Sequence, residues 1–437
     1  FLFARGGKDY EFTVIKKEEH IKNVKFDNAE IPYLTFLTKH IASLDSLAER
    51  IVAKRPPVQA YTDGPAILET PLSGKIKDKS AIKLLDEECK KSDGFNSKIV
   101  FITADAGHGK TALLRQYQYN QAQDYLNGDT NFLFWHIDLQ GRQLLRLSEA
   151  FMGDLGELRI SGLWWQSIIR LIKHGKLIIG IDGFDELAVE QGSNDALGAL
   201  SMIVNQIENS GTLVAASRRT FFDTEDYLKR SRLIEGRLNN LCQFDQINLE
   251  DWDKETALLF LINRGFQEPE VLFDEICTHL GRQENHPILT RPFLLSQLSK
   301  AILKYKISAS EFIGGMTNPE DPHKGVNSII EAFVKREVEE KWKSKETGEP
   351  YLTKDQHVEI LSAVAEEMWK SQRDRLSIEI VETLTVILLD QWHIEDKDLR
   401  LQIFEMIKMH ALLVMPIDGD TSYRKFEHPQ FKDYFTA

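Results

Sequence analysis

The residues from Ala104 to Thr111, ADAGHGKT, have the types and spacing of a phosphate-binding loop. They follow an apolar, strand-like segment over residues 99–102 and precede a helical pattern of apolar side chains. Backbone N–H groups in such a loop point at phosphates, and the helix dipole favours negative charge there. Lys110 would reach the β- and γ-phosphates of a nucleotide, and the Thr111 hydroxyl would hold Mg²⁺. We therefore expect nucleotide contacts from Ala106, Gly107, His108, Gly109, Lys110, Thr111 and Ala112.

The loop departs from the usual pattern at its first position, where Ala104 replaces a glycine. Alanine forbids the conformations with φ > 0 that glycine allows. Gly107 and Gly109, the glycines nearest to the expected phosphates, are present. The strand before the loop and the helix after it favour a working phosphate loop, and an ordinary strand-turn-helix is the alternative.

A cluster of acids follows a second apolar run, residues 176–181. Such a run is typical of a strand buried on both faces of a parallel sheet. Asp182 comes at the end of the run, where ligands bind in open α/β sheets. We expect Asp182 to orient the Mg²⁺ shell, and Asp185 or Glu186 to position and activate water.

A third strand-like run, residues 212–216, ends in Ser217, Arg218 and Arg219. An arginine at the tip of a strand beside the phosphate loop could contact the γ-phosphate, and we assign this role to Arg218. The alternative is two solvated arginines on a loop, and no role is assigned to Arg219.

These motifs together resemble the NACHT family of the STAND class of signalling NTPases, from about residue 97 to the last residue. Residues 182–186, DGFDE, are similar to the Asp-Gly-x-Asp-Glu cluster of that family, and residues 216–218, ASR, to its Thr-Ser-Arg sensor. Residues 289–295, LTRPFLL, resemble its proline motif, and residues 426–435, FEHPQFKDYF, its winged-helix signature. The resemblance implies that Pro292 lies by the adenine and that His428 contacts the β-phosphate of ADP in a closed form.

Strands that alternate with helical stretches predict an α/β fold, a P-loop parallel sheet with helices on both faces. An all-helical domain and a winged-helix domain are expected to follow. We expect His136 to be a buried strand residue without a metal partner, and Trp252 to belong to a helical core. The expected parts are an N-terminal module with a linker, the nucleotide-binding domain, the helical domain and the winged-helix domain, at residues 1–95, 96–249, 250–322 and 323–437.

Two of these parts carry further expectations. In the first, a strand over residues 10–15 and a helix over 32–54 precede a proline-rich segment, where regular structure is disfavoured. In the last, a β-hairpin is expected from residues 412–416 and 423–428.

Composition limits the classes of function. The 437 residues predict about three domains, and a net charge of −13 implies no broad affinity for nucleic acid. Three separated cysteines indicate reduced thiols of a cytoplasmic protein. No apolar run approaches the ~20 residues of a membrane span. A chain that starts at Phe1 without a signal peptide is expected to be a piece of a longer polypeptide.

The resemblance implies a switch that binds ATP or ADP with Mg²⁺ and hydrolyses ATP slowly. Such a protein senses a trigger, a protein or a nucleic acid, through parts outside this chain. It then opens, forms a homo-oligomer and activates an effector, in immune or antiphage defence. The alternative is an AAA+-like motor or loader acting on nucleic acid or protein, which would turn over ATP continuously. A third class is a scaffold that binds nucleotide without catalysis, against which Asp182, Asp185 and Glu186 argue.

Overall fold

The structure is a computed structural model of the chain. It describes residues 2–5, 8–17, 20–70, 74–91, 97–139, 147–160, 163–184, 204, 206–207, 210–219, 242–280, 282–305, 334–335, 337–344, 347–408, 410, 412–414, 416, 422–426 and 429–436.

A small antiparallel sheet opens the chain, with its strands in the order β1 (Leu2–Arg5), β2 (Lys8–Lys17), β3 (His20–Phe26) and β4 (Ala29–Pro32). Asp27 and Asn28 join β3 to β4 with φ values of 49° and 62°, the left-handed values of a two-residue hairpin turn. The helical segments α1 (Tyr33–Thr35), η1 (Phe36–Ile41, a π-helix) and α2 (Leu44–Lys54) follow. The strand expected at residues 10–15 thus lies within β2, and the expected helix is divided into three pieces.

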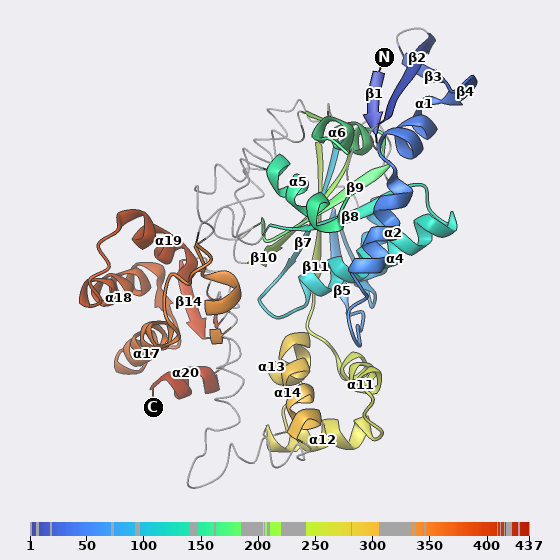
Figure 1. The fold of residues 1–437 in the computed structure, drawn as a ribbon. Helices are drawn as coiled ribbons and strands as arrows, with labels where there is room; N and C mark the ends of the chain where they lie inside the picture. Colours follow the sequence, from blue (N-terminus) through green and yellow to red (C-terminus); the bar gives the residue numbers. More distant parts are fainter. Residues whose placement is uncertain are drawn as a thin grey trace.

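The central sheet has seven strands in the order β6-β5-β11-β7-β10-β9-β8 (Figure 1). Its five parallel strands are β7 (Ser97–Ala104), β8 (Leu133–Asp138), β9 (Leu177–Asp182), β10 (Gly211–Arg218) and β11 (Cys242–Leu249). The strand β5 (Ala66–Thr70) pairs antiparallel with β11, and β6 (Gly74–Asp78) antiparallel with β5. The sheet therefore starts before residue 96, because the antiparallel pair of β5 and β6 forms one side of it.

Helices cover both faces of this sheet, as the sequence predicts. They are α3 (Ala81–Lys90), α4 (Lys110–Asn127), α5 (Leu147–Leu158) and α6 (Trp165–Lys173). Every residue of β7 is buried, and successive side chains enter opposite layers. Ile99 and Phe101 belong to a core with α2, α5 and α6, whereas Val100 and Ile102 belong to a core with α3 and α4.

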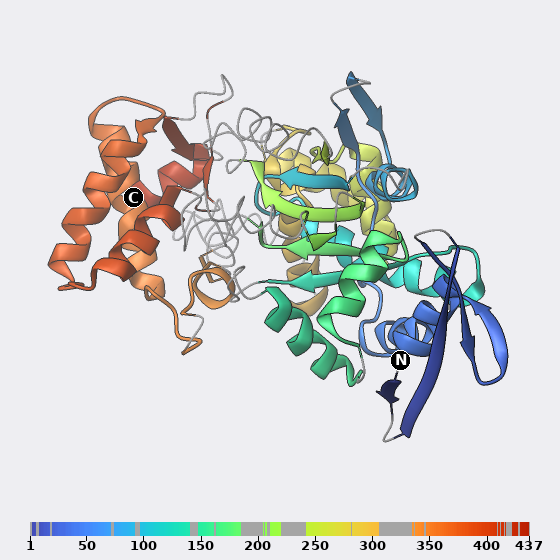
Figure 2. The same cartoon turned by 90° about the horizontal axis from the view of Figure 1, so that it is seen from above.

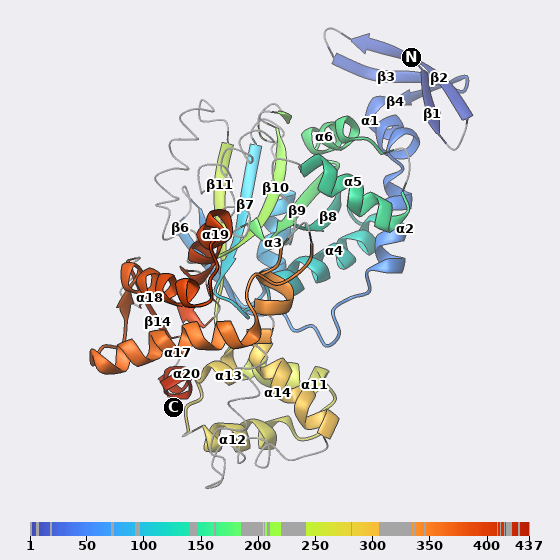
Figure 3. The same cartoon turned by 60° about the vertical axis from the view of Figure 1, so that its left-hand side comes forward.

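The helical domain consists of α11 (Lys254–Asn263), α12 (Pro269–His279), α13 (Pro287–Thr290) and α14 (Pro292–Tyr305). Its apolar side chains form one core cluster with those of the C-terminal region and with Ala106 of the phosphate loop. Figure 3 shows the helical domain and the small N-terminal sheet at opposite ends of the central sheet.

The C-terminal region is a winged-helix domain of helices and a three-stranded sheet in the order β12-β14-β13. Its elements are η3 (Glu337–Lys341, a π-helix), α17 (Lys354–Lys370), β12 (Leu376–Ser377), α18 (Ile378–Gln391), α19 (Lys397–Lys408), β13 (Leu413–Val414), β14 (Tyr423–Phe426) and α20 (Pro429–Thr436). Leu413 pairs with Phe426 in antiparallel register, which confirms the expected hairpin strands. Figure 2 shows this domain and the N-terminal sheet on opposite sides of the central sheet. Among the described residues, no helix is long and apolar enough to cross a membrane.

Candidate nucleotide-binding site

The phosphate loop lies between β7 and α4, where the sequence predicts it. Gly107 and Gly109 have φ values of 88° and 90°, left-handed values that favour glycine. Ala104 is instead the last residue of β7, where it pairs with Arg218 of β10. Its backbone does not have a positive φ. Alanine is therefore tolerated at the position where the usual pattern has glycine. The Lys110 ammonium donates to the carbonyl oxygens of Ala104, at 2.7 Å, and Asp105, at 3.2 Å.

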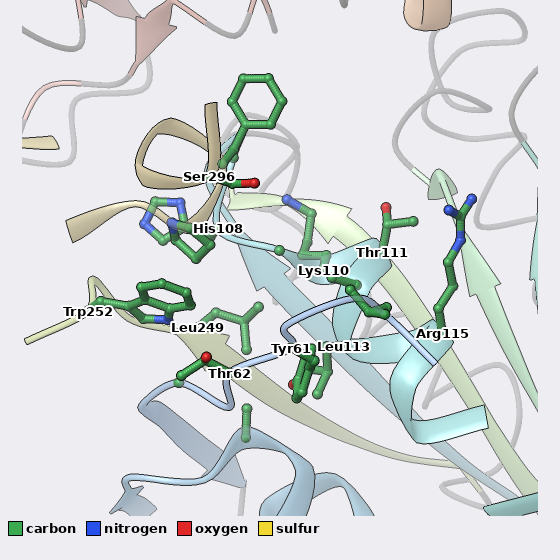
Figure 4. Close-up of a pocket in the computed structure, with 18 of the residues that line it drawn as sticks. Tyr61, Thr62, His108, Lys110, Thr111, Leu113, Arg115, Leu249, Trp252 and Ser296 are labelled. Atoms are coloured by element: carbon green, nitrogen blue, oxygen red, sulfur yellow. The ribbon is translucent and has the colours of Figure 1, made fainter. Parts of the chain in front are cut away.

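Every residue from Ala106 to Ala112 lines a pocket of about 510 Å³. Asp182, Arg218 and Pro292 line it as well, so the structure brings these predicted residues together. In Figure 4, Lys110 and Thr111 lie on one side of the pocket and Tyr61, Thr62 and Trp252 towards another. Among the described residues, the pocket lining is net positive, although the chain as a whole is acidic. Six basic side chains line the pocket against three acidic ones: Lys110, Arg115, Arg218, Arg264, Lys300 and Lys341 against Asp138, Asp182 and Glu250.

Thr111 and Asp182 form a donor set that suits Mg²⁺. Asp182 is buried at the end of β9, and Gly183 N donates to its Oδ1 at 3.0 Å. Burial alone would raise the pKa of Asp182, but His136, Lys341 and the Thr111 hydroxyl lower it below its ordinary value, so the carboxylate is ionised. Mg²⁺ commonly uses one or two carboxylates together with substrate phosphates. Within the described ranges, no group of three or more His, Cys, Asp or Glu side chains lies so that it could hold a metal.

His136 is buried in β8, as the sequence predicts, but it also faces the candidate metal site. Its Nε2 lies 3.7 Å from Asp182 Oδ2. Asp138, two residues later, lies opposite Asp182 in the parallel register and lines the pocket. Sequence reasoning missed Asp138 as a site residue, although an acid at the carboxyl end of a parallel strand is a usable signal.

The two arginines at the end of β10, Arg218 and Arg219, have different surroundings. Arg218 lines the pocket, and its Nη2 lies 3.4 Å from Glu337 Oε1 of the C-terminal domain. Arg219 Nη2 donates to the Leu249 carbonyl at 3.3 Å and lies 3.7 Å from Glu250 Oε1. Arg219 therefore connects the ends of β10 and β11 and is absent from the pocket lining.

The start of α14 is bound to the phosphate loop. Phe293 N donates to the Gly107 carbonyl at 3.0 Å, and Arg291 Nη1 donates to that of Ala106 at 3.4 Å. On the other side of the loop, His108 Nε2 lies 2.9 Å from Asp251 Oδ1. Burial lowers the pKa of His108, which keeps its imidazole neutral at neutral pH. Pro292 thus lies beside the loop because its two neighbours in sequence are attached to it.

The far end of the pocket is lined by a segment that sequence reasoning treated as linker, residues 58–65 except Asp63, with Trp252 and Phe260. A Cβ atom on Gly64 would lie only 2.4 Å from Trp252 Nε1, so a glycine permits this close approach. Trp252 is buried in the core as expected, yet it also lines the pocket. The prolines around this segment predicted irregular backbone and gave no sign of binding.

Three predicted residues, Asp185, Glu186 and His428, lie outside the described residues, so their roles stay predictions. The cysteines expected to be reduced thiols, Cys89, Cys242 and Cys277, are buried and take part in no disulfide bond.

Comparisons with known proteins concern the fold. No protein-family model matches the chain, and no curated protein matches it. A Walker-type ATPase of Pyrococcus abyssi has a similar structure, at 15% identity and a TM-score of 0.43, over 82% of this chain and 94% of that chain. The Aeropyrum pernix Orc2 protein, solved as ADPNP and ADP complexes, is 11% identical with a TM-score of 0.42, over 87% of this chain and 98% of that chain. The Aeropyrum pernix Orc1 protein, solved in complex with DNA, is 12% identical with a TM-score of 0.42, over 81% of this chain and 90% of that chain.

The chain has a P-loop fold of a mostly parallel sheet, a helical domain and a winged-helix domain.

Proposed function

We propose that this chain is an ATP- and ADP-binding switch with slow, Mg²⁺-dependent ATPase activity, of the kind represented by the NACHT family of STAND proteins. One observation supports the proposal most: the phosphate loop, the helical domain and the C-terminal domain all contribute side chains to a single pocket, through Lys110, Pro292 and Lys341. A nucleotide bound there would contact all three regions, so its identity can bias how they sit together.

The proposed roles follow the chemistry of the lining. Lys110 and the loop N–H groups hold the phosphates, and Thr111 with Asp182 would hold Mg²⁺, which neutralises phosphate charge when it is bound. Arg218 contacts the γ-phosphate, and Pro292 lies by the base. Asp185 or Glu186 activates water, and His428 contacts the β-phosphate of ADP. These assignments make the phosphate end of the pocket the part that distinguishes ATP from ADP.

The proposal includes the wider behaviour of the class. On a trigger sensed by parts outside this chain, ADP would be replaced by ATP, and the opened protein would form a homo-oligomer that activates an effector. Immune or antiphage defence in the cytoplasm is the setting in which such a switch works. Slow hydrolysis would return it to the closed form.

The alternative function is an AAA+ ATPase that acts on DNA as a motor or loader. The solved structures favour this alternative by name, because they include Orc proteins, one of them in complex with DNA. The acidic chain, with its net charge of −13, and the closure of three regions over one pocket favour the switch.

Turnover separates the two functions. We expect the full chain to bind ATP and ADP in calorimetry and to hydrolyse ATP slowly, at a steady-state rate that added double-stranded DNA does not change. Sustained turnover that DNA accelerates would replace the switch by the DNA-acting ATPase. Binding of neither nucleotide would remove both.

A further inference from the structure

A short π-helix of the C-terminal domain reaches the phosphate end of the pocket. Lys341, at the end of η3, lines the pocket together with Lys110, Thr111 and Asp182. Glu337, at the start of the same π-helix, contacts Arg218 at 3.4 Å. The backbone N–H of Trp342 donates to the Glu337 carbonyl at 2.7 Å, which holds the turn together. The π-helix η3 thus places a basic and an acidic side chain beside residues of the phosphate end that are more than 100 positions away in sequence.

Glu337 is a fully buried acid. Its side chain has 0% exposure, and its second oxygen, Oε2, accepts a hydrogen bond from Trp342 Nε1 at 3.0 Å. An ionised carboxylate is costly to bury unless positive charge and hydrogen bonds compensate it. Arg218 supplies positive charge, and it does so from the nucleotide-binding domain. This buried contact therefore ties the two domains together.

Within the described part of the chain, the Arg218 guanidinium contacts one acid and also lines the pocket that would hold a nucleotide. The acid is Glu337, and an anion in the pocket would be a second partner. A terminal phosphate carries more charge than a carboxylate and presents more acceptor oxygens, and guanidinium groups suit both. ATP brings such a group to this end of the pocket, and ADP does not.

We propose that Glu337 is an intramolecular competitor of the γ-phosphate for Arg218, and so a residue that sets the preference of the site between ATP and ADP. This inference rests on the proposed function. With ADP, Arg218 stays on Glu337 and the C-terminal domain stays on the nucleotide-binding domain. With ATP, Arg218 turns to the γ-phosphate and leaves the Glu337 carboxylate buried without that cation. The buried charge then favours release of η3 from the sheet, where water can reach it.

The test is a set of ATP and ADP affinities, measured by calorimetry with Mg²⁺ on the full chain. Glu337→Gln keeps the shape of the side chain and an acceptor for Trp342, but removes the charge that competes. We expect it to bind ATP at least about fivefold more tightly and ADP as before, a coupling within the usual range between two linked sites. Arg218→Gln should weaken ATP binding. Adding Glu337→Gln to this variant should not change the ATP affinity further.

Glu339→Gln is the matched control. Glu339 lies on the same π-helix, is 58% exposed and faces Lys335 at 3.7 Å, so its loss removes an equal charge without touching Arg218. We expect it to leave both affinities unchanged. An equal shift for ATP and ADP in Glu337→Gln, or a shift that persists without Arg218, would overturn the competition. Binding of neither nucleotide by the unaltered chain would instead remove the proposed function and this inference with it.

Hydrogen exchange on the unaltered chain covers the case in which Glu337→Gln does not fold. Amides of residues 337–344 should exchange faster when a non-hydrolysable ATP analogue is bound than when ADP is bound. Equal protection with both nucleotides would contradict the release of η3.

Discussion

The backbone N–H of Phe293 donates a hydrogen bond to the carbonyl of Gly107 over 3.0 Å, so α14 of the helical domain begins directly on the phosphate loop. This contact fixes Pro292, between Phe293 and the buried Arg291, against the loop at the edge of the pocket. A movement of the helical domain must therefore break a contact to the residues that would hold the phosphates. The geometry gives nucleotide binding a direct mechanical connection to the arrangement of the domains.

Gly64→Ala should damage the far end of the pocket, which Trp252 and Phe260 line. The new Cβ would lie 2.4 Å from Trp252 Nε1 and 2.9 Å from Cδ1, and the indole packs against Phe260 with ring centroids 5.4 Å apart. Overpacking of this kind typically costs about 1–3 kcal/mol. We expect a lower melting temperature and weaker ADP binding, measured by thermal unfolding and calorimetry.

Gly156→Ala is the control for this substitution. Gly156 lies in α5 and has nothing within 4 Å of an added Cβ, so alanine should leave ADP binding unchanged. If Gly64→Ala binds ADP as tightly as the wild type, residues 58–65 do not shape the nucleotide site.

Glu186→Gln should bind ATP but hydrolyse it more slowly. Glutamine keeps the shape of the side chain and loses the base, and loss of general-base catalysis typically costs about 10²–10⁴-fold in rate. The measurement is single-turnover hydrolysis at saturating ATP, with Asp185→Asn measured beside it. A wild-type rate in Glu186→Gln together with a slow Asp185→Asn would assign the water-activating role to Asp185.

His428→Ala should release ADP faster. A hydrogen bond to a charged group contributes ~1.5–3 kcal/mol, and its loss from the closed form alone shifts the closed-to-open ratio by roughly ten- to a hundredfold. The measurement is ADP dissociation from the variant and the wild type, with a thermal melt of each. An unchanged dissociation rate with a lowered melting temperature would show that His428 serves the core of the winged-helix domain.

The C-terminal domain should lose stability in mild acid. Burial lowers the pKa of His357 to about 3 and that of His410 to about 4, and an unfolded histidine titrates near 6.5. Between about pH 6.5 and 4 the unfolded chain therefore binds protons that the native domain does not. The free energy of unfolding is therefore highest above this window and falls as the pH drops through it. At pH 5 the loss is about 2 kcal/mol for each histidine.

Urea unfolding at pH 7.5 and pH 5.0 measures this effect. His357→Leu should reduce the pH dependence by about 2 kcal/mol, since one of the two buried imidazoles is gone. His393→Asn, a change at an exposed histidine with a left-handed φ of 56° that asparagine tolerates, should preserve it. Identical pH dependence in His357→Leu and the wild type would contradict the assignment to His357.

The sequence predicts those parts of the site that are local in the chain. The phosphate loop needs glycines at two left-handed positions and a lysine at the start of a helix, and Gly107, Gly109 and Lys110 are neighbours in sequence. The acids and arginines at strand tips, Asp182 and Arg218, follow from the rule that parallel strands end at one edge. Even the deviating Ala104 is explained once it is seen inside the strand.

The remaining site residues depend on contacts between distant segments. Glu337 and Lys341 reach the site only because the C-terminal domain packs against it, and a run of charged residues gives no sign of this. Gly64 is needed because Trp252 comes from another domain to lie against it. The strand β5 is short and surrounded by prolines, so its pairing with β11 could not be derived from local pattern.

The most direct test of the nucleotide site is calorimetry of ATP and ADP with Mg²⁺ on the wild type, Lys110→Ala and Lys370→Ala. Lys110 lines the pocket, whereas Lys370 is 57% exposed at the end of α17 and pairs with Glu366. We predict that both nucleotides bind the wild type and Lys370→Ala alike, and that Lys110→Ala loses binding because a charge-assisted phosphate contact is removed. A thermal melt should show that Lys110→Ala is still folded. Unchanged nucleotide affinity in Lys110→Ala would contradict the account.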